Sequence, residues 1–290
     1  MTLVAAATLL AGCTSAPAKD SPAVAAAQTP QQAQPSSSPL TAAVDHYAAY
    51  VDANAAGLVV RTRKFCAAID AGSLGKAKLL YSPARRYYEH IEPVATLWGP
   101  LAVQIDGRWE NPVTVRSKFI GFHRIEQLIW ADRTLNQAPA LCRGLVSHEE
   151  RLAALVKTAH YSPLQMAAGA TELVNEAARS KISGEEERYS NVDLPTLQAN
   201  MEGALEVFTM LKPYLQATGH ASVVSLIPQR YAGVGRVMAS FKAVPGYLDT
   251  GYVNYDQVSA RQRRTLSAAV NAFAEALSQL TAAVGGAEPA

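Results

Sequence analysis

A histidine and a glutamate three residues apart lie within the apolar stretch FIGFHRIEQLIW, residues 119–130. On a helix this spacing places His123 and Glu126 on one face, about a turn apart. Because apolar residues flank them on nearly every side, we expect a buried helix, in which both polar groups need partners. An imidazole and a carboxylate on one face make half of a metal site. The alternative is that the two side chains satisfy each other or neighbouring helices.

A pair of acids occurs earlier, in RRYYEHIEPV. Glu89 and Glu92 also have the three-residue offset, so their carboxylates project from one helical face. Pro93 cannot donate a hydrogen bond to the carbonyl of Glu89, which predicts a kink beside the two acids. A kinked helix with two facing acids could hold a cation. The alternative is that Arg85 pairs with Glu89 on a solvated face.

A third acidic patch is KISGEEERYSNVDL, in which Glu185 and Glu186 follow a glycine break. A run of acids is commonly a solvated helix start, where carboxylates also interact favourably with the helix dipole. If the three patches meet, many oxygen donors and one imidazole suit iron or manganese, and calcium less well. The same donors would accept other divalent cations.

The elements that must position these residues are helical nearly throughout, with apolar residues at spacings of three and four. No strand alternation is convincing, so the fold class is all-α. Short links between eight predicted helices favour two four-helix bundles packed into one unit. The predicted helices are Thr41–Ala71, Leu74–Trp98, Val115–Ala131, Ser147–His160, Pro163–Ser180, Thr196–Thr218, Ala221–Phe241 and Ser259–Val284. Two polar excursions, GPLAVQIDGRWENP and SGEEERYSNVDLP, are predicted loops.

The N-terminal segment MTLVAAATLLAGC has the length of a signal-peptide apolar region, and its end resembles a bacterial lipobox. We expect a signal peptide over 1–13 with acylation of Cys13, a disordered Ala/Pro/Ser/Gln tether over 14–39 and a helical domain over 40–290. An ordinary cleaved signal is the alternative. The net charge of +2 gives no indication of nucleic-acid binding.

Two further cysteines, Cys66 and Cys142, form an even pair in a chain expected to be exported. They could form a disulfide, and two separate buried thiols are the alternative. They are too few and too scattered for a zinc knuckle.

The motifs together resemble a known family. GFHRIEQLIW resembles the GxHxxE signature of the imelysin-like proteins, and SKISGEEERYSNVDL followed by LQANMEGA is similar to EfeO-type components of bacterial iron uptake systems. YYEHIEPVATLWG and QIDGRWEN match in order and spacing. The resemblance extends from Leu40 to the C-terminus. It departs at Asn191, where family members commonly have histidine, and the chain resembles the short form, without the cupredoxin domain of longer members.

The resemblance implies a pair of four-helix bundles, exported to the periplasm or cell surface as a lipoprotein, that binds Fe²⁺ or Fe³⁺ without catalysis. It implies delivery of the iron to a membrane permease, with a haem peroxidase-type partner in the same system. The metal-ligand residues that it implies are His123, Glu126, Glu89, Glu92, Asp106, Glu186 and its neighbour Glu185.

Two other functions remain as alternatives. A metallopeptidase is one, because imelysin-like proteins have been grouped with peptidases, but the HExxH pattern of hydrolytic zinc sites is absent. A binding module for an anionic polysaccharide or other solute is the second. The basic cluster RQRR, residues 261–264, could contribute to it, although short charged runs are often solvated helix ends.

Overall fold

A computed structural model describes residues 38–109 and 115–286 of the chain. Apart from isolated bridge residues, among them the pair Lys242 and Tyr252, the described residues contain no strand, and the all-α prediction is confirmed. Their nine α-helices are α1 (Pro39–Asp70), α2 (Leu74–Ile91), α3 (Pro100–Asp106), α4 (Gly121–Trp130), α5 (Ala138–Val156), α6 (Pro163–Arg179), α7 (Asp193–Ala217), α8 (Ala221–Ala239) and α9 (Ala260–Gly285). The predicted signal peptide, Cys13 and nearly all of the predicted tether lie outside the described residues.

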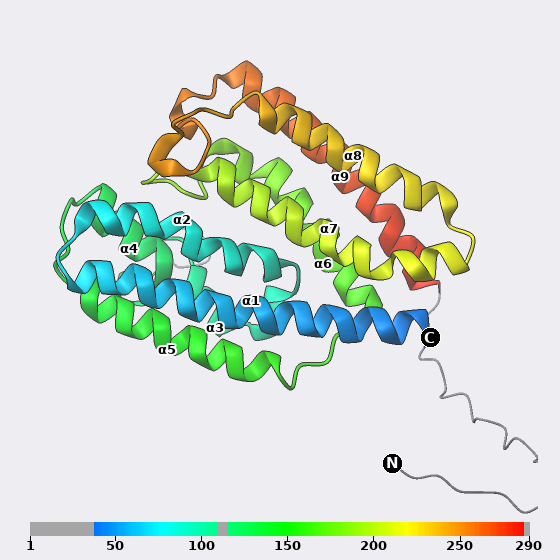
Figure 1. Ribbon diagram of the computed structural model, residues 1–290, viewed down its shortest axis with the longest axis horizontal. Coiled ribbons are helices and arrows are strands. Elements are labelled where there is room, and N and C mark those ends of the chain that lie inside the picture. Colours follow the sequence, from blue (N-terminus) through cyan, green and yellow to red (C-terminus); the bar gives the residue numbers. More distant parts are fainter. Residues whose placement is uncertain (1–37, 110–114, 287–290) are drawn as a thin grey trace, which may run out of the picture. The chain divides into compact units, whose positions relative to one another are not determined.

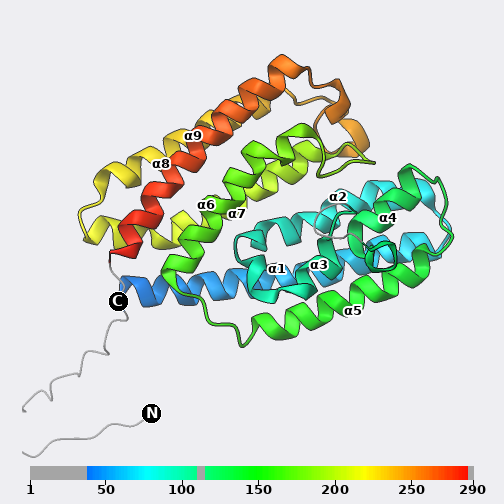
Figure 2. The same cartoon turned by 180° about the vertical axis from the view of Figure 1, so that it is seen from behind.

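The helices pack in two groups (Figures 1 and 2). Helix α1 lies between α2 and α5, and α4 packs on α5 and α2. In the second group α9 packs on α6 and α8, and α7 packs on the same two helices. Contacts of α7 with α2 and α1 join the groups. Residues between α6 and α7 are therefore held near α2.

The predicted helix Leu74–Trp98 is interrupted where its proline suggested. Helix α2 ends at Ile91, and residues Glu92–Trp98 continue as a 3-10 helix, η1. The cause is Pro93, which lacks the N–H that would bond to the carbonyl of Glu89. The prediction of a loop over the next segment was wrong in part, because residues 100–106 form α3, which ends at Asp106.

Helix α4 begins at Gly121, six residues later than predicted. Gly121 has φ +79°, and a Cβ at this position would lie 2.3 Å from the carbonyl oxygen of Ile105. Only glycine permits both this backbone conformation and this approach of α4 to the end of α3. The first residue of the GxHxxE motif thus brings His123 close to Asp106. Helix α5 begins at Ala138, nine residues earlier than predicted.

Cys66 of α1 and Cys142 of α5 are joined by a disulfide, with Cα atoms 5.6 Å apart. The sequence left open whether the two thiols are bonded, because their separation depends on how the two helices pack. Of these alternatives, the structure contains the bonded pair.

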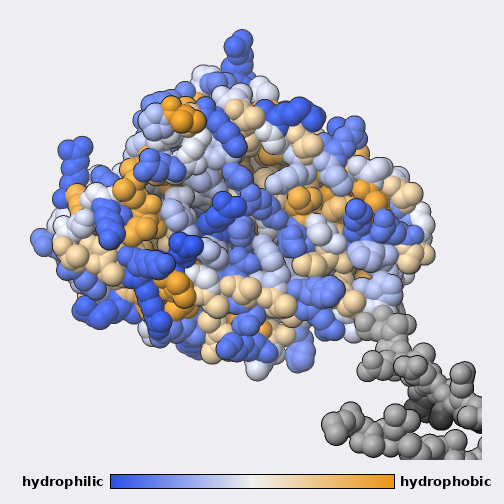
Figure 3. Space-filling view, viewed as in Figure 1, coloured by the Kyte–Doolittle hydropathy of each residue, from blue (hydrophilic) through white to orange (hydrophobic). Residues whose placement is uncertain are grey.

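One face of the helical domain is covered mostly by hydrophilic side chains, with small apolar areas between them (Figure 3). The exposed large apolar residues are scattered: Val60, Leu79, Leu97, Val115, Leu155 and Val244. Within residues 38–109 and 115–286, no helix is long and apolar enough to cross a membrane.

Candidate metal centre

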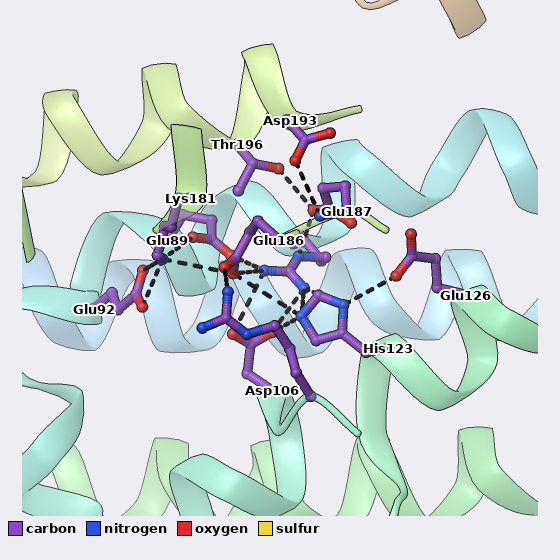
Figure 4. A network of polar contacts seen from close by, with 12 residues as sticks. Glu89, Glu92, Asp106, His123, Glu126, Lys181, Glu186, Glu187, Asp193 and Thr196 are labelled. Atoms are coloured by element: carbon purple, nitrogen blue, oxygen red, sulfur yellow. Dashed lines mark hydrogen bonds and ion pairs between the residues drawn. The ribbon is translucent and has the colours of Figure 1, made fainter. Parts of the chain in front are cut away.

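A cluster of charged side chains lies inside the domain where the two groups of helices meet (Figure 4). Its members come from α2, η1, α3 and the residues directly after it, α4, the segment between α6 and α7, and the first residue of α7. The carboxylates are Glu89, Glu92, Asp106, Glu126, Glu186, Glu187 and Asp193, and the basic side chains are Arg85, Arg108, Lys181 and His123. The three sequence patches therefore do meet, and Asp106 joins them.

The imidazole of His123 is held at both nitrogens. Nε2 lies 2.6 Å from Nη1 of Arg85, and Nδ1 lies 3.0 Å from Oε2 of Glu126. Since a guanidinium can only donate, Nε2 must accept, and the proton of the neutral ring is on Nδ1, donated to Glu126. Burial, followed by the positive charge of Arg85, lowers the pKa of His123, which agrees with a neutral ring.

Glu126 anchors the acidic segment to α4. Its Oε1 accepts hydrogen bonds from the backbone N–H groups of Tyr189 and Ser190, at 2.9 and 2.7 Å. Its Oε2 accepts from His123. Glu126 is fully buried, so both oxygens depend on these donors for compensation. His123 and Glu126 therefore satisfy each other, which is the alternative to a metal site that the sequence left open. Nε2 of His123 faces the remaining carboxylates.

Arg85 occupies the centre of the cluster and is 0% exposed. Its Nη1 lies 2.8 Å from Oδ1 of Asp106, and its Nη2 bonds to Glu89 and lies 3.4 Å from Oε1 of Glu186. Its Nε lies 3.1 Å from Oε1 of Glu187. The Arg85–Glu89 pair considered from the sequence exists, but the expected solvated face was wrong, because the pair is buried.

Lys181 is the second buried cation. Its Nζ lies 2.8 Å from each carboxylate oxygen of Glu92 and 3.5 Å from Oε1 of Glu186. Asn200 of α7 completes this corner, since its Nδ2 donates to Glu89 and Glu92, both at 2.7 Å. The acidic pair of α2 and η1 is thus compensated by residues from the other group of helices.

The two adjacent glutamates of the GEE segment have different surroundings. Glu186 is buried and pairs with Arg108, Lys181 and Arg85. Glu185 is exposed and borders a small surface pocket. Glu187, which was not among the predicted ligands, accepts hydrogen bonds from Tyr81 at 3.1 Å and Thr196 at 2.7 Å.

The cluster contains more acids than permanent cations, with seven carboxylates against Arg85, Arg108 and Lys181. Burial and neighbouring acids raise the pKa of Glu92 to about 8 and the pKa of Asp106 well above its usual value. Burial likewise raises the pKa of Glu187 to about 7. Burial alone would raise the pKa of Glu186 as well, but Lys181, Arg108 and Arg85 hold it well below its usual range. The site is therefore one that favours added positive charge.

Two sets of side chains could each place three donor atoms on one cation, with all atoms in a set within 4.8 Å of one another. One set is Asp106, His123 and Glu186, and the other is His123, Glu126 and Glu187. In the first set, Nε2 of His123 lies 3.6 Å from Oδ1 of Asp106 and 4.0 Å from Oε1 of Glu186. Neighbouring ligands at metal–donor distances of about 2.0–2.3 Å lie roughly 3.0–3.8 Å apart, so His123 and Asp106 already have a suitable separation and Glu186 needs only a small approach. The first set uses Nε2, the nitrogen of the ring that carries no proton and whose lone pair accepts from Arg85, so it fits a metal better.

A cavity of about 800 Å³ borders the cluster. It is lined by residues of η1, α3 and α6, and three carboxylates of the cluster reach it: Glu92, Asp106 and Glu186. The side chains of Glu92 and Asp106 are 17% and 10% exposed, whereas Glu89 and Glu126 are fully buried. A cation from solvent would therefore meet Glu92, Asp106 and Glu186 first.

Two other residues noted in the sequence, Asn191 and Arg263, make contacts that stabilise the fold. Asn191 has φ +55°, a conformation that asparagine tolerates, and its carbonyl accepts from the N–H of Tyr255. Arg263 of the RQRR cluster donates to backbone carbonyls of Val258, Tyr255 and Ser183. This arginine is thus engaged in holding the loop before α9 against the acidic segment.

The domain is all-helical, and its carboxylates and imidazole are directed into one buried cluster. These features place the protein in the class of helical proteins whose polar core resembles a metal-binding site. Comparison with protein families shows which family within this class it belongs to. Residues 43–280 match the family model described as imelysin, which also carries the label peptidase M75. The chain belongs to the imelysin family.

Named relatives match most of the chain. The protein named iron uptake system component EfeO of Escherichia coli K12 is 35% identical over 252 residues, which cover 85% of this chain and 64% of that protein. The proteins of the same name from Escherichia coli O1:K1 and Shigella flexneri give the same identity and coverage. The chain therefore spans somewhat less than two thirds of the length of these relatives.

Proposed function

We propose that this protein is an extracytoplasmic iron-binding component of an EfeUOB-type iron uptake system. The observation that carries the proposal is the convergence of Asp106, His123 and Glu186 on one buried point beside a cavity. Oxygen donors with one imidazole suit iron in either common oxidation state. The name of the relatives, iron uptake system component, supports iron as the cargo.

Within this proposal the predicted ligands have separate roles. Asp106, His123 and Glu186 bind the cation, and Glu92 binds it at the edge of the cavity. Glu126 acts through His123, because it fixes Nδ1–H and leaves Nε2 directed at the cation. Glu89 lies deeper, between Arg85 and Asn200. It compensates the charge of Arg85 and accepts a hydrogen bond from the amide of Asn200. Glu185 has no ligand role in this arrangement.

The setting of the protein is proposed from the sequence and the relatives. A lipid on Cys13 would hold the helical domain near the membrane, where it passes iron to a permease, with a haem peroxidase-type protein in the same system. The two groups of helices correspond to a pair of four-helix bundles, α1, α2, α4 and α5 against α6 to α9. We propose binding rather than catalysis, since a single histidine reaches the described cluster and hydrolytic zinc sites typically use more nitrogen donors.

Elemental analysis and titration of the purified protein test the proposal. Fe(II) under anaerobic conditions, and Fe(III) presented as a weak chelate, are expected to bind and to raise the melting temperature. The affinity is expected to fall in His123→Ala and to be unchanged in His220→Ala, at the residue preceding α8. The proposal would be overturned if the purified protein retained no iron and its melting curve were unchanged by added iron, manganese and zinc.

A further inference from the structure

Arg85 makes contacts that a bound cation would also need. Its Nη1 lies 2.6 Å from Nε2 of His123 and 2.8 Å from Oδ1 of Asp106. These are two of the three donor atoms in the set that best fits a metal. The guanidinium therefore lies at the ligand atoms themselves and not at the edge of the cluster.

A metal and the guanidinium cannot both hold these donors in the observed arrangement. The two donor atoms are 3.6 Å apart. A cation bound at about 2.1 Å from each would come within about 3 Å of Nη1. A guanidinium does not lose its proton in proteins, so the repulsion is relieved only by movement of one of the two positive charges.

Arg85 keeps partners if it withdraws from His123 and Asp106. Its Nη2 bonds to Glu89 and its Nε faces Glu187 at 3.1 Å, and neither carboxylate belongs to the set of Asp106, His123 and Glu186. The face of Phe122 also lies 5.8 Å from Cζ. The guanidinium can thus remain paired on one side while the other side is given to a cation.

We propose, resting on the function proposed above, that Arg85 is an internal counter-ion that competes with the cargo cation for His123 and Asp106. Binding of the cation displaces Nη1 from both atoms, and Arg85 remains paired with Glu89 and Glu187. Return of the guanidinium favours departure of the cation. Arg85 therefore lowers the affinity of the site and keeps the acids compensated when the site is empty.

The test compares cation binding by the wild type, Arg85→Met, Arg85→Lys and the control Arg63→Met, in which an exposed arginine paired with Glu150 is lost. Mn(II) is the probe because it does not undergo oxidation during the titration. Arg85→Met is expected to bind Mn(II) at least about tenfold more tightly than the wild type, since a nearby positive charge is removed. Arg85→Lys is expected to be intermediate, and Arg63→Met unchanged.

Thermal unfolding gives a second readout. Without a cation, Arg85→Met is expected to melt below the wild type because its acids are uncompensated, and Mn(II) is expected to raise its melting temperature by more than it raises that of the wild type. Equal or weaker Mn(II) binding by Arg85→Met, with binding by the wild type intact, would overturn the role of Arg85 alone. Absence of Mn(II) and iron binding in the wild type would overturn the proposed function instead.

A measurement on the wild type covers the case in which Arg85→Met does not fold. In a crystal structure of the wild type with Mn(II), Nη1 of Arg85 is expected to have left hydrogen-bonding distance of His123 Nε2. An Mn(II)-bound structure in which this contact persists would overturn the proposal.

Discussion

Nε2 of His123 accepts a hydrogen bond from Arg85 at 2.6 Å, while Nδ1 of the same ring lies 3.0 Å from Glu126. The ring thus links an internal cation on α2 with a buried carboxylate on its own helix. Since one nitrogen accepts a hydrogen bond and the other donates one, the tautomer and the orientation of the ring are fixed before any cation binds. This preorganisation is the basis of the prediction for Glu126 below.

Replacement of Glu186 by glutamine should weaken iron binding strongly, and replacement of its neighbour should not. Glu186 is buried among three basic side chains beside His123, whereas Glu185 is exposed. We expect Glu186→Gln to lower the affinity for Fe(II) by about a hundredfold or more, because a side chain proposed to touch the metal directly is lost. Calorimetric titration of both variants checks this, and equal affinities would contradict the assignment.

Glu126→Gln should act through the histidine. The glutamine amide can accept at one position only, so it cannot serve His123 Nδ1–H and the N–H groups of Tyr189 and Ser190 together. We expect the affinity for Fe(II) to fall by about 10- to 100-fold. Nitrogen-15 NMR of the imidazole should show a mixture of tautomers where the wild type has one. A wild-type ring spectrum in this variant would show that Glu126 does not set the tautomer. Glu150→Gln, at an exposed position of α5, is the control.

Stability at alkaline pH should depend on a glutamate outside the cluster. Glu149 of α5 is fully buried, accepts a hydrogen bond from Thr62 at 2.8 Å, and has a pKa that burial raises to about 8. A carboxyl whose folded pKa is raised contributes stability that is complete below its unfolded pKa of about 4.3 and is lost as the pH rises through the folded value.

The free energy of unfolding of the wild type should therefore fall between about pH 4.3 and pH 8 relative to that of Glu149→Gln. At pH 9 the variant should be the more stable by at least about 1 kcal/mol, because it buries no charge. Urea unfolding of both proteins at pH 5, 7 and 9 checks this. Parallel pH dependences would contradict the assignment of the slope to Glu149.

Two helical glycines should respond to alanine with opposite signs. A Cβ at Gly203 of α7 would lie 2.4 Å from the carbonyl oxygen of His90 in α2, and a Cβ at Gly235 of α8 would lie in open space, with no neighbouring atom within 4 Å. We expect Gly203→Ala to destabilise the fold by about 2 kcal/mol or more through overpacking, and Gly235→Ala to stabilise it by about 0.5–1 kcal/mol. Chemical unfolding measures both. Equal effects would mean that α2 and α7 are not in close contact at this point.

The parts of the fold that the sequence predicted well have strong local signals. Ser162 and Ser259 form capping boxes at the starts of α6 and α9, within one residue of the predicted starts. The first half of α5, which contains Pro139 and Gly144, was not predicted. Proline is accommodated in the first helical turn, and a glycine costs a helix only about 1 kcal/mol, which the packing of α5 on α1 can offset.

Most acids of the candidate site and its histidine could be predicted, because the resemblance to the imelysin-like motifs identifies them, but Glu187 and Asp193 were not among the predicted ligands. The buried cations were missed, since whether a basic side chain is solvated depends on tertiary packing. For Arg85 a signal was present. It is four residues after Tyr81 and four before Glu89, all three fully buried on α2. A basic residue in phase with a buried stripe that contains an acid predicts an internal ion pair.

The disulfide joins Cys66 and Cys142, which are 76 residues apart in the sequence. Between these two cysteines lie α2, η1, α3 and α4. Glu92, Asp106 and His123 are therefore carried on a covalent ring, whereas Glu186 is contributed from outside it. Ring closure restricts the unfolded chain in the stretch that supplies most of the donors. Oxidation of the two cysteines thus helps to keep the candidate ligand atoms together, and the noncovalent docking of the Glu186 segment remains the step that completes the set.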